Sequence, residues 1–454
     1  MLEHPAQKVF NSRRAHNVTL NATHDPQLRS WVVSANLPDS DFPIQNLPFA
    51  VFRPAKSDEP FRGGVAIGDQ ILDLLALWSR GLFDEFTQAL LAAGSRPTLN
   101  HLMSMGPEAS SRLRKSLSAI LREGHTRAAR LHDALIPQSQ AEFSLPATIG
   151  DYTDFYVSIH HATAVGRQFR PDNPLLPNYR WMPIAYHGRS SSIQVSEHNF
   201  TRPIGQRQAS GALAPMVGPS RRLDFELEIG VLVGRANAQG SAIPINEAES
   251  HAFGLCLIND WSARDIQGWE YQPLGPFLSK NFATTISPWV VTMEALAPFR
   301  IPFSRASSDP QPLPYLHDST RAGAAGLDVE LEVSLQTVRM REQGLKPQRL
   351  ARSNLGHAYW SVAQMITHHT INGCNLRAGD LLGTGTLSGP SQDEAGSLME
   401  LTLGGKQPVT VGSAETRTFL EDGDRVVLKA WCERTGHRRI GFGTAVGTVL
   451  PARV

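Results

Sequence analysis

One stretch near the middle of the chain, residues 223–233, constrains the fold most, because its polar and apolar side chains alternate strictly. The apolar side chains are those of Phe225, Leu227, Ile229, Val231 and Val233, and the carboxylates between them belong to Asp224, Glu226 and Glu228. A period of two residues predicts a β-strand whose two faces differ. We therefore expect one apolar face and one face that carries carboxylates.

The acidic face has two interpretations. On an edge or surface strand it would simply lie in water, which is the more common case. Against this, Glu is a poor strand residue, and the pleat holds successive carboxylates of one face roughly 6 to 7 Å apart. At an effective dielectric constant near 20, each like-charged pair at about 5 Å costs on the order of 3 kcal/mol. A divalent cation would reverse that sign, and oxygen ligands suit Mg²⁺ or Ca²⁺ far better than zinc.

Length and charge limit the function classes. A chain of 454 residues is long enough for a large buried core and for two or three domains. Its 43 basic and 42 acidic residues give a formal net charge of +1. This balance provides no broad electrostatic field for nucleic acid or an anionic membrane. The expected partners are therefore small molecules or a second copy of the chain.

Cysteine usage indicates the compartment. Cys256, Cys374 and Cys432 are widely spaced and form no C-x-x-C motif. This set argues against a disulfide framework and a thiolate zinc site, and it fits a reducing cytosol. No apolar run approaches the roughly 18 to 20 residues of a membrane-spanning helix, and the N-terminus has no signal-peptide pattern. We expect a cytoplasmic protein with no membrane contact.

The chain divides into three parts. Residues 1–38 are polar with little apolar periodicity and are expected to form a flexible extension. Residues 39–145 contain short β-like runs, a hairpin-type turn at Gly68-Asp69, and a helical period at 113–121, ahead of a proline-bounded linker. They predict a small β-barrel-like domain with a helical segment. Residues 146–454 are expected to form the larger, catalytic domain.

Two segments of the larger domain carry candidate functional side chains. If Thr153 caps a helix, then Asp154, Ser158 and His161 share one helical face, although an acid there often only complements the helix dipole. After the buried strand 254–259, a helix would align Asp260, Arg264 and Gln267 on one stripe, although such an Asp is most often an N-cap.

Other segments are weaker signals. Residues 397–403 alternate like a strand, which would direct Glu400 away from Met399 and Leu401. The chain has no G-x-S-x-G motif, which excludes a serine-hydrolase elbow. The glycine-rich segment Gly383 to Gly389 lacks the ending of a phosphate-binding loop and is a weak nucleotide signal.

The order and content of these motifs resemble those of the fumarylacetoacetate hydrolase family. The resemblance rests on Asp154-Phe155-Tyr156, on Asp224-x-Glu226-x-Glu228, and on the segments 259–267 and 383–389, and it extends from about Asp39 to Leu450. It implies an α+β, mainly β fold with a small N-terminal SH3-like β-barrel domain and a larger C-terminal mixed β-roll. It also implies a homodimer whose active site lies in the C-terminal domain.

The resemblance also implies a role for each matching residue. The ligands of a Ca²⁺ or Mg²⁺ ion would be Asp154, Glu226, Glu228 and Asp260, with a second ion near Asp260, Lys280 and Thr284. His161, rather than His160, matches the general base, and Glu400 would hold it. The oxyanion donors would be Arg264, Gln267 and Lys280. The substrate-contacting positions would be Tyr156, Arg170, Tyr186, Gln267, Tyr271 and Thr386.

The implied reaction is hydrolysis of a carbon–carbon bond in a β-diketone, converting fumarylacetoacetate to fumarate and acetoacetate in tyrosine and phenylalanine breakdown. Such a reaction needs a base that titrates near neutrality, donors for an oxyanion and a Lewis acid for the leaving enolate. Two alternatives remain at this point. One is an oxo-acid decarboxylase or hydratase of the same fold, and the other is a non-catalytic protein stabilised by Ca²⁺.

Overall fold

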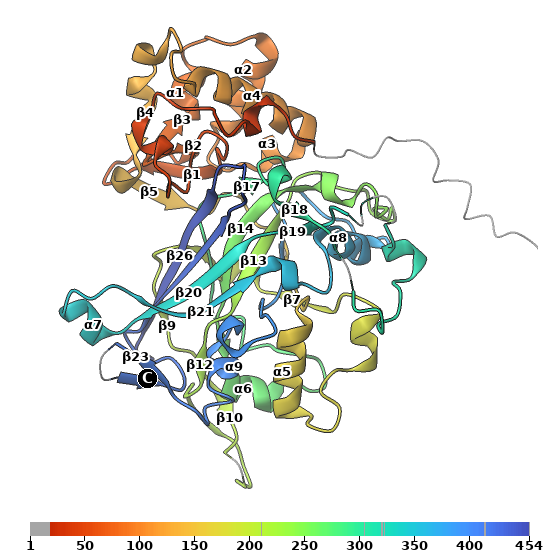
Figure 1. The fold of residues 1–454 in the computed structure, drawn as a ribbon. Helices are drawn as coiled ribbons and strands as arrows, with labels where there is room; N and C mark the ends of the chain where they lie inside the picture. Colours follow the sequence, from red (N-terminus) through yellow and green to blue (C-terminus); the bar gives the residue numbers. More distant parts are fainter. Residues whose placement is uncertain are drawn as a thin grey trace, which may run out of the picture.

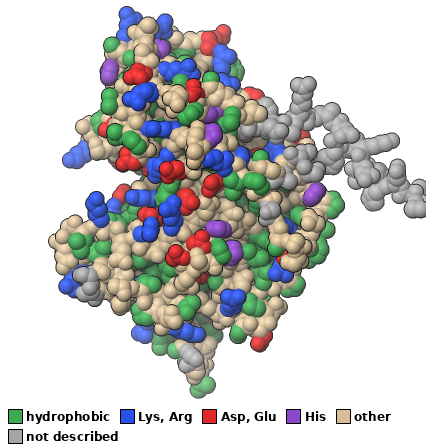
Figure 2. All heavy atoms as spheres, viewed as in Figure 1, with side chains coloured by type: hydrophobic (Ala, Val, Ile, Leu, Met, Phe, Trp, Pro, Cys, Tyr) green, Lys and Arg blue, Asp and Glu red, His purple; other side chains and the backbone are tan. Residues whose placement is uncertain are grey.

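A computed structural model describes residues 19–209, 211–303, 305–318, 321, 323–412 and 415–453. It shows a smaller N-terminal part packed against a larger, mainly β C-terminal part (Figure 1). On the face shown in Figure 2, acidic and basic side chains are interspersed, in keeping with the nearly balanced composition. Within the described ranges, no helix has the length and apolar character needed to cross a membrane.

The N-terminal part is built on an antiparallel sheet that forms a half-barrel. Its strand order is β4-β3-β2-β1-β5. The strands are β1 (Phe49–Pro54), β2 (Arg62–Ile67), β3 (Gln70–Asp73), β4 (Leu135–Pro137) and β5 (Ala141–Ser144). Its helices are α1 (Leu74–Trp78), α2 (Glu85–Gly94), α3 (Asn100–Ser104) and α4 (Pro107–Leu121). The predicted small β module, its hairpin turn at Gly68-Asp69 and its helix near 113–121 are confirmed.

Part of the segment expected to be a flexible extension is packed. Thr23 and Ser30 are buried, and Arg114 of α4 donates from Nε to Thr23 Oγ1 at 2.9 Å. Ser30 Oγ donates to the carbonyl of Leu121 at 2.8 Å. The prediction is therefore wrong for residues 19–38, because they are fixed by buried polar contacts that leave no apolar period in the sequence. Residues 1–18 lie outside the described residues.

The C-terminal part contains an eight-stranded mixed sheet. Its order is β7-β6-β22-β13-β14-β16-β8, with β17 pairing with β14. The strands are β6 (Tyr152–Phe155), β7 (Ala185–Gly188), β8 (Ile193–Val195), β13 (Leu227–Val233), β14 (Ala252–Asp260), β16 (Thr284–Ile286), β17 (Val291–Thr292) and β22 (Leu381–Gly383). The second half of the alternating stretch, β13, is thus a central strand rather than an edge strand, and all seven of its residues are buried. The stretch is not one continuous strand, because residues 225–226 belong to no strand and separate 223–224 from β13.

The two faces of this sheet have different neighbours. Ile229 and Val231 of β13 belong to the main core of the C-terminal part. Leu232, on the other face, belongs to a core shared with the N-terminal part, together with Cys256 of β14. Further along that second face, beyond Gly230, the side chain of Glu228 follows. The predicted division into an apolar face and a carboxylate face is confirmed.

A second, five-stranded sheet packs against the main core. Its order is β21-β20-β25-β26-β9. The strands are β9 (Phe200–Thr201), β20 (Glu330–Gln336), β21 (Gln348–Asn354), β25 (Arg425–Cys432) and β26 (Ile440–Leu450). Leu331, Leu428 and Phe442 of this sheet share the core with Ile229 and Val231. The long strands of both sheets lie side by side beneath the N-terminal part in Figure 1.

Short elements complete the C-terminal part. The helices are α5 (Ile159–Phe169), α6 (Arg264–Glu270), α7 (Val338–Glu342), α8 (Val362–Thr370) and α9 (Leu398–Leu401). The two-stranded pairs are β10 (Ile204–Arg207) with β11 (Met216–Pro219), β12 (Leu223–Asp224) with β15 (Ser262–Ala263), β18 (Arg300–Ile301) with β19 (Gly326–Leu327), and β23 (Val409–Val411) with β24 (Glu415–Arg417). Helices α5, α6 and α9 gather near one end of the main sheet (Figure 1).

Candidate active site

Four carboxylates meet at one end of the main sheet. They belong to Asp154 on β6, to Glu226 directly before β13 and Glu228 within it, and to Asp260 at the end of β14, and one oxygen of each lies within 4.8 Å of the others. The register explains the meeting, because Gly383 of β22 pairs with Asp154 on one side and with Gly230 on the other. The structure thus brings together all four predicted ligands of the first ion.

The cluster is electrostatically incomplete. Glu228 is fully buried, and neither of its side-chain oxygens has a hydrogen-bond partner among the described residues. Burial, reinforced by the charges of Asp154 and Glu226, raises the pKa of Glu228 well above its ordinary value. Burial and the charge of Asp260 likewise raise the pKa of Asp154. Buried oxygens without donors fit a hard divalent cation, which would take ligands of this kind.

Glycine leaves room for the cluster. A Cβ at Gly383 would lie 2.5 Å from Asp154 Oδ1 and 3.2 Å from Glu228 Oε2. Two residues on, Gly385 has φ +73° and donates its N–H to Asp154 Oδ1 at 3.1 Å. The glycine-rich segment, a weak nucleotide signal in the sequence, therefore forms one wall of the carboxylate cluster.

The positions predicted for a second ion surround Asp260. Lys280 donates from Nζ to Glu226 Oε2 at 2.5 Å and to Asp260 Oδ2 at 2.8 Å. Thr284 Oγ1 donates to Asp260 Oδ1 at 2.6 Å, and Tyr186 Oη donates to Asp260 Oδ2 at 2.8 Å. Burial alone would raise the pKa of Glu226, but Lys280 and Arg264 hold it below its ordinary value. These cations offset part of the negative charge of the cluster.

A buried histidine–glutamate pair lies on α5 and α9. His161 Nδ1 lies 2.7 Å from Glu400 Oε2. Helix α5 begins at Ile159 with Ser158 as its N-cap, while Asp154 lies in β6. The prediction of one helix from Thr153 carrying Asp154, Ser158 and His161 is therefore wrong. The spacing i, i+4, i+7 suggested one helix, but the three residues belong to a strand, an N-cap and a helix in turn.

Glu400 is held by hydroxyl groups as well as by His161. Its Oε2 accepts from Ser397 Oγ at 2.7 Å and from Ser388 Oγ at 3.1 Å. Burial alone would raise the pKa of Glu400, but His161 and these two hydroxyls lower it. The predicted strand at 397–403 is wrong, because Ser397 caps the short helix α9 by accepting the backbone N–H of Glu400. The carboxylate is thereby turned toward α5.

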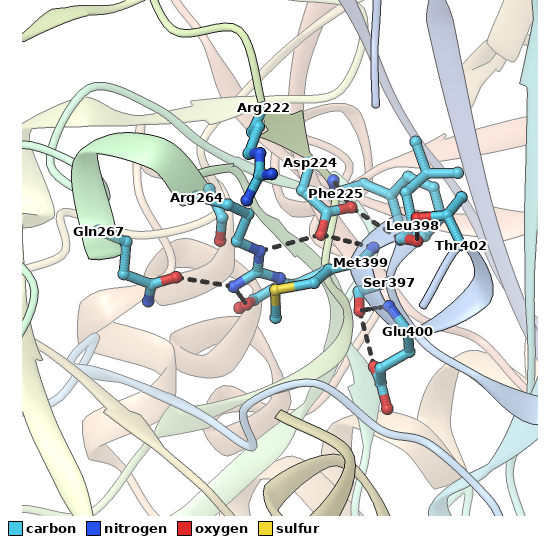
Figure 3. Close-up of polar contacts among 12 residues, drawn as sticks. Arg222, Asp224, Phe225, Arg264, Gln267, Ser397, Leu398, Met399, Glu400 and Thr402 are labelled. Carbon is cyan, nitrogen blue, oxygen red and sulfur yellow. Dashed lines mark hydrogen bonds and ion pairs between the residues drawn. The ribbon is translucent and has the colours of Figure 1, made fainter. Parts of the chain in front are cut away.

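Arg264 joins the carboxylates to helix α6. Its Nε donates to Asp224 Oδ2 at 2.9 Å, and its Nη1 lies 2.8 Å from Glu226 Oε1 and 3.1 Å from Gln267 Oε1 (Figure 3). Its Nη2 is buried and has no hydrogen-bond partner in the described part of the chain. Asp260 ends a strand, so the prediction that it shares a helical stripe with Arg264 and Gln267 is wrong.

Three of the predicted substrate-contacting residues touch the groups described above: Tyr156 contacts His161, Tyr186 contacts Asp260, and Gln267 contacts Arg264. The Tyr156 ring meets the His161 ring edge-on with centroids 5.4 Å apart. Burial raises the pKa of Tyr156, and the charge of Glu400 raises it further. Thr386 Oγ1 and Arg170 Nε are buried atoms with no hydrogen-bond partner among the residues described. Tyr271 directly follows α6 and donates its N–H to the carbonyl of Gln267.

Sequence reasoning did not assign a role to three polar residues at this site. Ser388 and Ser397 hold Glu400, and Asp224 holds Arg264. Asp224 is recognisable in the sequence as the first carboxylate of the alternating stretch, but the sequence does not show that it binds Arg264 and the start of α9 instead of joining the cluster. The serines gave no signal, because their hydroxyls serve a residue that only tertiary contacts bring near His161.

The fold and the buried cluster define a class of protein. Residues 152–450 match the C-terminal domain of fumarylacetoacetate (FAA) hydrolase, and residues 45–146 match the fumarylacetoacetase N-terminal domain. The chain belongs to the fumarylacetoacetate hydrolase family.

Several relatives resemble the chain over nearly its whole length. The fumarylacetoacetase of Oryza sativa subsp. japonica is 48% identical over 435 residues, which cover 94% of this chain and 98% of the relative. That of Homo sapiens is 46% identical over 427 residues, covering 91% and 97%. Among solved structures, a fumarylacetoacetate hydrolase from psychrophilic Exiguobacterium antarcticum is 17% identical with a TM-score of 0.47, covering 90% of this chain and 100% of that one.

Proposed function

We propose that this chain hydrolyses fumarylacetoacetate to fumarate and acetoacetate, a step of tyrosine breakdown. The observation that carries the proposal is the buried carboxylate cluster with the His161–Glu400 pair beside the cationic groups of Arg264 and Lys280. Near-full-length identity to proteins named fumarylacetoacetase supports the substrate. A non-catalytic Ca²⁺-binding protein would need the cluster but would have no use for a buried base or an unpartnered guanidinium nitrogen.

The carboxylates of Asp154, Glu226, Glu228 and Asp260 are proposed to hold the divalent ion, with Ca²⁺ and Mg²⁺ the candidates that suit oxygen ligands. We propose Lys280 and Thr284 as the neighbours of a second ion beside Asp260. When bound, the metal supplies Lewis-acid stabilisation of negative charge on substrate oxygens. The partnerless oxygens of Glu228 support this assignment over a purely protein-internal ion-pair network.

His161 is proposed as the general base. Its Nδ1 is hydrogen-bonded to the ionised Glu400, and its Nε2 makes no hydrogen bond within the described part of the chain. An Nδ1–H donated to Glu400 leaves Nε2 as the basic nitrogen, which can take a proton from water. The hydroxide so formed adds to one carbonyl carbon of the diketone, and the carbon–carbon bond then breaks. The released carbanion takes up a proton to give acetoacetate.

Arg264, Gln267 and Lys280 are proposed as donors to the oxyanion. The unpartnered Nη2 of Arg264 is the donor that the structure supports best, since its other nitrogens are engaged by Asp224, Glu226 and Gln267. Lys280 Nζ donates to Glu226 and Asp260 and would add its positive charge to the oxyanion site from there. For the remaining substrate contacts we propose Tyr156, Arg170, Tyr186, Tyr271 and Thr386.

Three further assignments are proposals that follow from the family. The boundary between the domains is placed near residue 146, in the connection between β5 and β6. A homodimer and a cytoplasmic location complete them. The three cysteines are free, and two of them are buried, which suits a reducing compartment.

A substrate-depletion assay tests the proposal. We expect loss of the diketone absorbance and formation of acetoacetate, abolished by a chelator and restored by Ca²⁺ or Mg²⁺. His161→Ala should lower kcat by about 10² to 10⁴-fold, because the positioned base is lost, while metal binding stays nearly intact. Wild-type activity in His161→Ala would exclude the assigned base.

The second candidate is an oxo-acid decarboxylase or hydratase of the same fold. Decarboxylation needs the metal but no activated water, so it would leave the buried His161–Glu400 pair without a task. Absence of acetoacetate among the products, with consumption of a related oxo-acid, would favour this alternative.

A further inference from the structure

Asp224 lies beside the site but is not one of the four residues of the carboxylate cluster. It is fully buried at the end of β12, and its side chain accepts four hydrogen bonds. Its Oδ1 accepts the backbone N–H of Phe225 at 2.9 Å and of Leu398 at 2.7 Å. Its Oδ2 accepts the backbone N–H of Met399 at 3.1 Å and Arg264 Nε at 2.9 Å.

These four bonds join two parts of the proposed catalytic machinery. Leu398 and Met399 open helix α9, the turn that carries Glu400, and Arg264 opens helix α6. Figure 3 shows the carboxylate of Asp224 between the Arg264 guanidinium and the start of α9. A negative charge at the first N–H groups of a helical turn fixes them through hydrogen bonding. One side chain therefore sets the position of the guanidinium relative to the carboxylate that holds His161.

We infer that Asp224 is a positioning residue for catalysis, which fixes the direction of Arg264 Nη2 and the placement of Glu400 against His161. The inference rests on the proposed function. Arg264 is a planar fork, so a bond at Nε together with Glu226 at Nη1 determines where the unpartnered Nη2 is directed. Among the described residues, the Asp224 side chain hydrogen-bonds to none of the four cluster carboxylates and not to the imidazole, so it acts through Arg264 and the start of α9.

The conservative variant Asp224→Asn tests this inference. Asparagine keeps the shape of the side chain but removes its charge. Its amide NH₂ replaces one carboxylate oxygen and cannot accept the two hydrogen bonds that this oxygen accepts in the wild-type protein. We expect kcat to fall by about 10²-fold, the loss typical of one misplaced oxyanion donor, with little change in KM.

A matched control exists in the N-terminal half-barrel. Asp73 is also buried, and its Oδ1 accepts the N–H groups of Leu75 and Ala76 at the start of α1. Its Oδ2 accepts Arg62 Nε at 2.7 Å. Asp73→Asn thus breaks the same chemistry far from His161, and should cost thermal stability without changing kcat.

A double-variant cycle shows whether Asp224 acts through Glu400. Combined with Glu400→Gln, Asp224→Asn should lower kcat less than it does alone, because part of its effect is already lost. If Asp224→Asn does not fold, Asp224→Ser, which keeps a capping oxygen without the charge, takes its place.

Three results would overturn the inference while leaving the proposed function intact: wild-type kcat in folded Asp224→Asn, full additivity with Glu400→Gln, or an equal loss of kcat in Asp73→Asn. Absence of turnover in the wild-type protein would instead count against the proposed function. In that case, a Glu400 side chain still fixed against His161 in a crystal structure of Asp224→Asn would refute the positioning role by itself.

Discussion

At the scale of single residues, the three carboxylates spaced two positions apart in the alternating stretch have three different environments. Asp224 is satisfied by backbone N–H groups and Arg264, and Glu226 lies between Lys280 and Arg264. Glu228 has no donor at all among the described residues. Asp224 thus stabilises the surrounding protein structure, whereas Glu228 keeps its oxygens available for a cation. The partnerless residue is the one whose pKa burial raises most plainly.

The His161–Glu400 pair gives a prediction about activity. Because the pKa of Glu400 is lowered, its carboxylate is ionised near neutral pH and can accept the Nδ1–H of His161. Glu400→Gln should lower kcat by about 10-fold or more, since the imidazole loses its orientation. Steady-state kinetics check this, and a wild-type kcat in the variant would contradict it.

The same lowered pKa has a consequence for folding. A carboxyl group whose pKa is lower in the folded state contributes stability above its ordinary value, and that contribution is lost as the pH falls through the lower, folded value. The Glu400→Gln variant should therefore lose less stability than the wild-type protein between about pH 4.5 and more acidic conditions.

At the scale of elements, the site depends on β22, a strand that lies between β6 and β13 and has a glycine, without a side chain, beside the carboxylates. β22 contributes glycine where β6 and β13 direct carboxylates toward each other. Gly383 lies outside the left-handed region, so its value is space rather than backbone freedom. The start of α5 positions His161, the proposed base, because Ser158 caps the helix three residues before it.

Filling that space should weaken metal binding. In Gly383→Ala, the added methyl group would lie 2.5 Å from Asp154 Oδ1, which displaces the carboxylate. We expect a loss of roughly 10- to 100-fold in Ca²⁺ or Mg²⁺ affinity, measured by calorimetry, together with lower activity. Gly323→Ala is the control, since a Cβ there would have no atom of the described residues within 4 Å, apart from its own chain neighbours. Unchanged metal affinity in Gly383→Ala would contradict the proposed role of the wall.

At the scale of the whole molecule, the carboxylate cluster and the contact between the domains lie on the same face of one sheet. Leu232 and Cys256 pack into a core that also contains Phe49 and Val65 of the half-barrel. Glu228 and Asp260 continue that face toward the open end. Strain or repulsion at the cluster therefore acts on a sheet that both parts of the protein use as a core.

Metal binding should accordingly stabilise the protein as one unit. We expect Ca²⁺ or Mg²⁺ to raise the Tm of chelator-treated protein, by an amount that grows with ion concentration, because the ion relieves repulsion among four buried carboxylates. Scanning calorimetry should show one transition that moves as a whole. Glu228→Gln should reduce the shift, and an equal shift in that variant would place the stabilising ion elsewhere.

Local sequence patterns predicted much of this architecture. The alternation at 223–233 predicted a two-faced strand, the turn at Gly68-Asp69 predicted a hairpin, and the period at 113–121 predicted α4. The errors at 153–161 and 397–403 arose where a short side-chain cap decided the local structure. Ser158 and Ser397 end one conformation and begin another within a few residues, which is too short a distance for a periodic signal.

The sequence by itself determined the chemical character of the protein, because the carboxylates, the imidazole and the ordered motifs are properties of the residues and their order. Only the tertiary structure decided that Glu228 has no hydrogen-bond partner among the described residues and that Asp224 joins Arg264 to the start of α9. Asp224 and Glu228 share the same place in the alternating sequence pattern, so that pattern does not separate them, but in the structure they lie on different strands, β12 and β13. Their difference comes from Leu398, Met399 and Arg264, which are distant along the chain and adjacent only after folding.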